Sequence, residues 1–199
     1  FILRISIMDT NPHSPHTIFR LHGKVDQMLR ESSIPYSIVQ SNVFMQNFSL
    51  YWGYSISRND TFFSMHDDYL VSYIDMRDVA EICATILTNP GAHQNREYTV
   101  TGSESLSDQD VSRILSRVAG RTIRPVSVDE DRFREELLSL GMPEWDINLY
   151  ISLEHSILEG QHSVISNEIM SLTGRLATTF EQFARDYAQT WEKAPAGVP

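Results

Sequence analysis

The stretch Phe1-Ile-Leu-Arg-Ile-Ser-Ile7 decides the fold class of this chain. It is almost continuously apolar and rich in β-branched residues, which is typical of a strand covered on both faces of a parallel sheet. Apolar residues then recur at three- and four-residue spacing from Ile18 to Leu29, which predicts an amphipathic helix ending near Glu31. Residues 34–39 are typical of a second strand. The sequence therefore predicts an α/β fold built on a parallel strand-helix-strand unit.

Beyond this unit the pattern becomes more irregular and increasingly helical. We predict helices over residues 43–52, 75–89, 107–120, 129–140, 143–159 and 178–191, a short helical piece over 166–172, and strands over 61–65, 69–74, 97–101 and 121–128. We expect one domain over residues 1–193, in which 1–60 hold the parallel strands and crossover helix and 61–193 form a substrate-binding lid. Residues 194–199 are typical of a frayed tail.

The charge and the cysteine content narrow the possible partners. The chain has 26 acidic and 16 basic residues and a formal charge of -10, which repels nucleic-acid phosphates and anionic lipid. The single cysteine, Cys83, lies in an apolar helical pattern, which predicts a buried thiol in a reducing, cytoplasmic compartment. We find no apolar run of about 18 residues and no signal-peptide pattern. These features favour a small-molecule partner over nucleic acid or membrane.

Short motifs along almost the whole chain occur in the order of a known family. They are Ile5-Ser6, His22-Gly-Lys-Val-Asp26, Asn42-Val-Phe-Met-Gln-Asn-Phe48, Ser72-Tyr-Ile-Asp-Met-Arg-Asp-Val-Ala-Glu81, Tyr98-Thr-Val-Thr-Gly102, Gly141-Met-Pro-Glu-Trp145, Leu172-Thr-Gly174 and Thr179-Phe-Glu-Gln-Phe183. In this order they resemble the NmrA-like branch of the atypical short-chain dehydrogenase/reductase superfamily. The resemblance is to its C-terminal part, without the N-terminal nucleotide-binding half. It implies a truncated doubly wound, Rossmann-like parallel sheet with a mostly helical lid.

The cofactor fingerprint of this family does not occur in the sequence. A Gly-x-x-Gly-x-x-Gly turn brings backbone N–H groups and a helix N-terminus to the pyrophosphate. The chain has nine glycines, and no three of them have this spacing. We therefore expect no cofactor, with NAD(P)H only if an upstream nucleotide-binding half exists.

The resemblance also implies an active-site position. Ser6 ends the first strand, where the superfamily commonly places a hydroxyl that faces the substrate carbonyl. His22 and Asp26 lie one helical turn apart, where classical members have a Tyr-x-x-x-Lys pair. An imidazole oriented by a carboxylate suits acid/base catalysis, so His22, Asp26 and Ser6 are the predicted catalytic residues. The alternative is an ordinary surface pair of the helix.

Candidate substrate-binding residues follow the second predicted strand and recur in the late helices. They are Phe44, Met45, Gln46, Asn47, Phe48, Trp52, Tyr73, Met142 and Trp145. Core packing is the alternative for the apolar members. Asp75 and Asp78 are expected to cap a helix, and the turn His66-Asp67-Asp68 is too weak a signal to predict a metal site.

Three functions remain open at this point. The first is a cofactor-independent isomerase, cyclase or lyase that binds a small apolar metabolite in a former reductase crevice. The second is an NAD(P)H-dependent oxidoreductase of which this chain is the C-terminal part, and the third is a regulator that binds a protein partner. We favour the first. An apolar strand at the edge of the sheet also predicts a homodimer.

Overall fold

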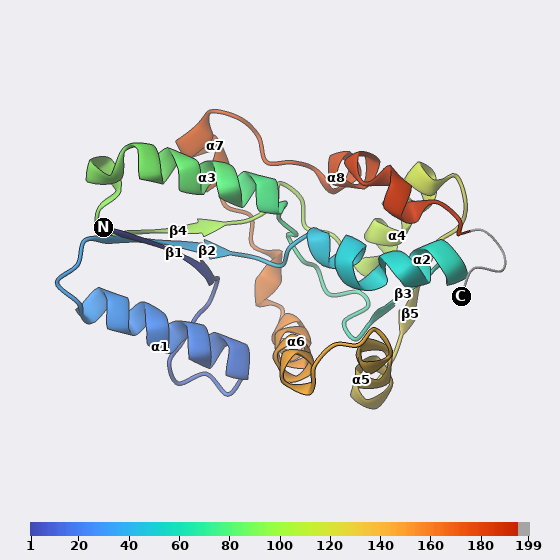
Figure 1. Ribbon diagram of the computed structural model, residues 1–199. Helices are drawn as coiled ribbons and strands as arrows, with labels where there is room; N and C mark the ends of the chain where they lie inside the picture. Colours follow the sequence, from blue (N-terminus) through green and yellow to red (C-terminus); the bar gives the residue numbers. More distant parts are fainter. Residues whose placement is uncertain (195–199) are drawn as a thin grey trace.

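The computed structural model describes residues 1–194 and has the predicted α/β architecture (Figure 1). Strand β1 (Ile2–Ile7), helix α1 (Thr17–Glu31) and strand β2 (Tyr36–Ser41) form the expected unit, and β1 and β2 are parallel. Strand β4 (Arg96–Val100) adds a third parallel strand, in the order β1-β2-β4. The tail was predicted over residues 194–199, of which 195–199 lie outside the described residues.

Helices cover both faces of this sheet. In Figure 1, α1 lies below the sheet, whereas α3 (Met76–Thr88) lies above it beside α7 (Glu168–Thr173). The face toward α3 is a dry core in which Val39, Ile82 and Val100 are fully buried. This layering fixes the carboxyl ends of β1 and β2 at one edge of the sheet, which faces the second half of the chain (Figure 1).

The second half surrounds a two-stranded parallel sheet of β3 (Thr61–Ser64) and β5 (Arg124–Ser127). Its helices are α2 (Gly53–Asn59), α4 (Asp108–Ala119), α5 (Glu130–Ser139), α6 (Glu144–Ile157) and α8 (Phe180–Asp186). Aromatic rings fill the centre: Phe48 packs edge-on against Phe62, Tyr73 and Phe180, with ring centroids 5.2 to 5.4 Å apart. Edge-to-face packing of this kind stabilises a core beyond its buried area.

Two expectations about strands and helices are wrong. Residues 69–74 form no regular strand: the only pairings there are isolated bridges, from Val71 to Leu106 and from Ile74 to Phe44. The helix expected from residue 43 starts later, with a π-helical turn over Phe48–Trp52 that leads into α2. Both differences have one cause, since backbone groups of residues 43–45 are hydrogen-bonded to Ile74 instead of to a local helix.

Helix capping follows the sequence closely. Asp75 caps α3 by accepting a hydrogen bond from the Arg77 backbone N–H, and Ser107 caps α4 in a reciprocal capping box. Asp78 has a different role from the expected one. Its fully buried carboxylate accepts hydrogen bonds from Arg175 and from the backbone and hydroxyl of Thr178, and so holds the C-terminal segment against α3.

Strand β1 is an edge strand, and the expectation that it is covered on both faces is wrong. Ile5 is 51% exposed and Ile2 is 41% exposed, and neighbouring residues of α1 extend the apolar surface, with Met28 at 70%. Unpaired backbone groups on an apolar edge favour association. No helix in the described part of the chain is long and apolar enough to cross a membrane.

The exposed edge of β1 gives a first prediction. The chain of residues 1–199 should self-associate in solution, and Ile5→Lys should weaken this association because it places a charge on the apolar edge. Light scattering over a concentration series measures the effect. Leu176→Lys, which changes a 71% exposed leucine elsewhere, serves as the control and should leave the mass unchanged. A monomeric wild-type chain would contradict the prediction.

Candidate functional site

A mostly apolar cavity of about 180 Å³ lies at the carboxyl ends of β1 and β2. Open α/β sheets bind their ligands at this edge. Residues from the strand ends, from α1, from the π-helical turn and from α6 form its walls. They are Ile7, Met8, Ile18, Phe19, Ser41, Asn42, Val43, Phe44, Asn47, Tyr51, Tyr150, Leu153 and His162.

The cavity exists because the chain does not turn into a helix directly after β2. The backbone of Val43 accepts a hydrogen bond from Ile74 N–H at 2.9 Å, and Met45 N–H donates to Ile74 carbonyl at 2.9 Å. This pairing keeps residues 42–45 extended beyond the end of the strand. The π-helical turn then begins, and Asn47 and Tyr51 both border the cavity.

The Asn42 side chain joins three segments that are far apart in the sequence. Its amide donates to Ser72 Oγ at 2.7 Å and to His162 carbonyl at 2.8 Å. Its carbonyl oxygen accepts from Val43 N–H at 2.8 Å and contacts His162 Nδ1 at 2.8 Å. The buried Asn42 therefore uses both ends of its carboxamide, and it fixes the wall of the cavity at His162.

The hydrogen bonds of His162 assign its tautomer. Because Asn42 offers a carbonyl oxygen, Nδ1 carries the proton, and Nε2 lies 2.9 Å from Ser156 Oγ, whose hydroxyl also donates to the Leu153 carbonyl at 2.7 Å. Burial lowers the pKa of His162 to about 4. The imidazole is therefore neutral near pH 7 and acts as a structural link, with no spare nitrogen for a ligand.

Asn47 brings a carboxamide to the cavity that remains available. Among residues 1–194 its carboxamide makes no hydrogen bond to protein, although its backbone N–H donates to the Phe44 carbonyl at 3.1 Å. A free carboxamide offers both a donor and an acceptor to a ligand. The cavity thus combines apolar walls with one free carboxamide, and Tyr51 and Tyr150, which carry hydroxyl groups, also border it.

The predicted catalytic residues do come together, on the α1 side of the sheet. Ser6 Oγ donates to Asp26 Oδ2 at 2.7 Å and lies 3.4 Å from His22 Nδ1. However, Asp26 is fully buried and is also bound by Arg4 and Thr10, and Arg4 lies 3.2 Å from His22 Nδ1. Burial, together with Arg4, lowers the pKa of His22. Asp26 therefore pairs with Arg4 rather than orienting His22, and none of the three predicted residues borders the cavity. Their catalytic role stays a prediction.

The predicted substrate-binding residues separate into groups. Phe44 and Asn47 border the apolar cavity. Met45 is core, and Gln46 is buried by hydrogen bonds to Asp75 and to Met76 N–H. The others lie elsewhere: Phe48, Trp52 and Tyr73 border a smaller inner cavity, Met142 lies in a surface groove near α6, and Trp145 is 65% exposed on the outer side of α6.

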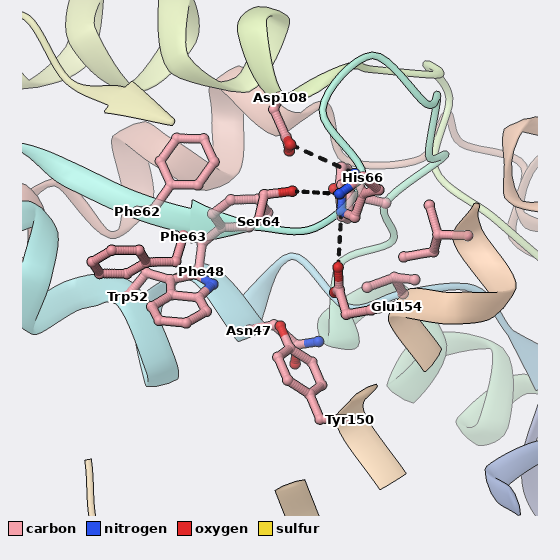
Figure 2. A pocket seen from close by; sticks show the side chains of 13 residues that line it. Asn47, Phe48, Trp52, Phe62, Phe63, Ser64, His66, Asp108, Tyr150 and Glu154 are labelled. Carbon is pink, nitrogen blue, oxygen red and sulfur yellow. Dashed lines mark hydrogen bonds and ion pairs between the residues drawn. The ribbon is translucent and has the colours of Figure 1, made fainter. Parts of the chain in front are cut away.

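The inner cavity holds a polar cluster that the sequence analysis missed (Figure 2). The buried His66 ring lies between two buried carboxyl groups: Nδ1 is 3.6 Å from Asp108 Oδ2, and Nε2 is 3.7 Å from Glu154 Oε2. Burial raises the pKa of Asp108 to about 7 and that of Glu154 to about 8, and it lowers the pKa of His66 to about 4. One signal was available, because Glu154 interrupts the apolar stripe of Ile147, Ile151 and Ile157 on α6.

Comparison with known proteins identifies relatives. The model of the NmrA-like family matches residues 7–184. An NAD(P)H azoreductase of Xenophilus azovorans is 34% identical over 92% of the chain and 63% of its own length, and an agroclavine dehydrogenase of Claviceps fusiformis is 29% identical over 86% and 59%. The chain spans about three fifths of the length of these curated relatives.

Solved structures have the same fold at low identity. An NADPH-dependent quinone oxidoreductase of Escherichia coli gives a TM-score of 0.82 at 18% identity, covering 94% of this chain and 67% of its own. A triphenylmethane reductase of a Citrobacter species gives 0.79 at 19%, covering 94% and 65%. At these identities the likeness shows the fold alone, and it confirms the Rossmann-like class.

The comparisons correct the favoured function. The expectation of a cofactor-independent isomerase, cyclase or lyase is wrong, because the relatives are named as reductases and dehydrogenases, and the closely matching azoreductase is named for NAD(P)H. The expectation of no cofactor fails on the same finding. The family resemblance is confirmed, whereas its restriction to the C-terminal part of a member is not borne out by these matches.

The Asn42 contacts give a second prediction. Asn42→Ala should lower the free energy of unfolding by about 2 to 3 kcal/mol, because it leaves buried polar partners at Ser72 and His162 without their hydrogen bonds. Urea denaturation measures the loss. Asn148→Ala, at an exposed asparagine that contacts Arg134, is the control and should change stability by less than about 0.5 kcal/mol. Equal stabilities of the two variants would contradict the structural role of Asn42.

Proposed function

The chain belongs to the NmrA-like family, and we propose that the protein is an NAD(P)H-dependent oxidoreductase that reduces a flat, apolar organic acceptor. One observation carries the proposal: the apolar cavity with a free carboxamide lies at the carboxyl ends of two parallel strands. Nicotinamide cofactors bind at this edge in dinucleotide-binding folds. The names of the relatives support the same class of reaction.

The residues of the cavity fit the ring end of such a cofactor. A nicotinamide ring is flat, with one amide group, and the cavity offers apolar walls and the unbonded Asn47 carboxamide. Asn47 and Phe44 would hold the ring. The sequence contains no glycine-rich turn that could bind the phosphate end of the cofactor. The described residues therefore account for the reacting end of the cofactor only.

The residues of this chain contribute to the reaction by orienting the reacting groups and by excluding water from them. Bound NAD(P)H supplies two electrons and one hydrogen as hydride. Tyr51, Tyr150 and Leu153 enclose the space beside the strand ends, which excludes water from the reacting atoms. Asn47 orients the flat ring through a hydrogen bond. A correct orientation within a closed site lowers the barrier, because translational and rotational freedom is already lost on binding.

The acceptor is proposed from the walls of the cavity. They are built mainly from aromatic and aliphatic side chains, which favour a conjugated, uncharged molecule over a sugar or a phosphate ester. The relatives named for azo and quinone reduction act on molecules of this kind, so azo compounds and quinones are the first acceptors to test.

We also propose a cytoplasmic location. The only cysteine, Cys83, is 9% exposed, and burial raises the pKa of its thiol. A lone buried thiol in a protein that uses a reduced nicotinamide cofactor fits a reducing compartment. Fractionation of the natural host would test this location.

The proposed function gives a third prediction. Leu153→Trp should raise the KM for an azo or quinone acceptor at least about tenfold, because the larger ring occupies the cavity. The rate of NADPH oxidation by the protein is the measurement. Leu138→Trp, at a 47% exposed leucine of α5, is the control and should keep the wild-type KM. A wild-type protein that oxidises NADPH with neither class of acceptor would overturn the proposed function.

A further inference from the structure

The inner cavity contains polar atoms that lack partners. Within residues 1–194, His66 Nδ1, Asp108 Oδ2 and Glu154 Oε2 are fully buried and make no hydrogen bond. The three residues are 5%, 1% and 4% exposed, and all three border the cavity. A buried polar group without a partner costs about 1 to 3 kcal/mol of stability. Three such groups around one cavity therefore indicate a bound ligand.

The size and shape of the site identify that ligand as water. The cavity has a volume of about 20 Å³, whereas one water needs at least about 10 to 15 Å³ and two to four polar partners. The two carboxyl groups face opposite nitrogens of the His66 ring, at 3.6 and 3.7 Å, so one metal ion cannot bind both of them and the ring. In the described part of the chain no group of three or more His, Cys, Asp or Glu side chains could hold a metal ion.

The inner cavity and the apolar cavity share a wall. Val43, Asn47 and Tyr150 border both of them. Tyr150 and Glu154 are four residues apart on α6 and so lie on the same face of this helix. Figure 2 shows both side chains at the inner cavity, with Glu154 linked to His66. The Tyr150 ring is held in place by stacking on Phe133 at 5.6 Å.

From this geometry we infer that Glu154 and one internal water on the Nε2 side of the His66 ring form a proton reservoir that supplies the reductase site through the hydroxyl of Tyr150. The inference rests on the proposed function. Reduction of an acceptor double bond adds one hydride, from the reduced nicotinamide, and one proton. The Tyr150 O–H gives this proton to the acceptor atom, the internal water reprotonates Tyr150, and Glu154 reprotonates the water. Glu154 then takes a proton from solvent.

The charges around the cluster favour a stored proton. Besides the three members, the titratable groups that face the cluster are Asp67, Asp68, Tyr73, Tyr150 and His162. Asp67 and Asp68 act on Asp108, and Asp108 acts on Glu154. Because all three are acidic, a further negative charge in the cluster is unfavourable. With pKa values of about 8 for Glu154 and about 4 for His66, the proton resides on the carboxyl group near pH 7. Burial also raises the pKa of Tyr150, so Tyr150 passes on its proton only as the water replaces it.

The first experiment tests the reservoir without any cofactor. Infrared spectroscopy from pH 5 to pH 9 detects the carbonyl band of a protonated carboxyl group. In wild type a band should titrate near pH 8, and Glu154→Gln should remove it. Glu144→Gln, the same change at an exposed position of α6, should leave it in place. Asp108 should give a second band that titrates near pH 7 in both proteins. A band that still titrates near pH 8 in Glu154→Gln would overturn the inference, as would a high-resolution crystal structure with no water in the inner cavity.

The pH dependence of the free energy of unfolding gives a second measurement on Glu154. A carboxyl pKa raised from 4.5 to about 8 stabilises the fold below pH 4.5, and this contribution is lost as the pH rises to about 8. Between these values the unfolding equilibrium constant of wild type should grow relative to that of Glu154→Gln, by up to about tenfold per pH unit. A constant ratio would show that Glu154 is ionised in the fold and would overturn the inference.

The second experiment tests the relay. With NADPH and a quinone, Tyr150→Phe should lower kcat about 100-fold or more, while the infrared band of Glu154 still titrates. Glu154→Gln should also lower kcat and should abolish its decline above pH 8. If wild type is active and both variants keep its kcat and pH profile, the relay is wrong and the proposed function stands. If wild type does not oxidise NADPH, the proposed function and the relay both fail, and the infrared band still decides whether Glu154 stores a proton.

Discussion

The carboxamide of Asn42 is the contact on which the functional half of the structure depends. It joins the end of β2 to Ser72 and His162, which are 30 and 120 residues away in the sequence. It lies next to the backbone bonds of Val43 and Met45 to Ile74, which keep residues 42–45 extended beyond β2. The wall of the cavity at the strand ends is therefore held by this backbone pairing together with one buried amide that satisfies four polar groups at once.

The sequence predicted those parts of the fold that local chemistry decides. The strand-helix-strand unit, the caps at Asp75 and Ser107 and the order of the later helices all follow from spacing and capping residues. It failed for residues 69–74, whose conformation is set by contacts to distant segments. For the same reason it misjudged the faces of β1: an apolar, β-branched run is the same whether its faces are covered or free, and only the tertiary structure, in which Ile5 is 51% exposed, reveals which.

The candidate site shows a similar division. The sequence brought Ser6, His22 and Asp26 together correctly, because they lie on one strand and one helix that pack against each other. The sequence could not reveal that Arg4, two residues before Ser6 on the same strand, donates a hydrogen bond to the carboxylate of Asp26. It also placed Phe44 and Asn47 beside the strand ends, where they border the cavity. The polar cluster of His66, Asp108 and Glu154 comes from three separate elements, and only the tertiary fold assembles it.

The two adjacent cavities meet opposite requirements of a reduction. Transfer of a hydride proceeds best where water is excluded, and the apolar cavity is enclosed mainly by hydrocarbon and aromatic rings. Delivery of a proton needs a polar, hydrated group, which would spoil that dryness if it lay in the same space. The shared wall of Val43, Asn47 and Tyr150 separates the two environments, and Tyr150 is the only one of these three side chains with a hydroxyl that can carry a proton across. Because Glu154 stands one helical turn from Tyr150, the rigidity of α6 fixes the distance over which the proton must move.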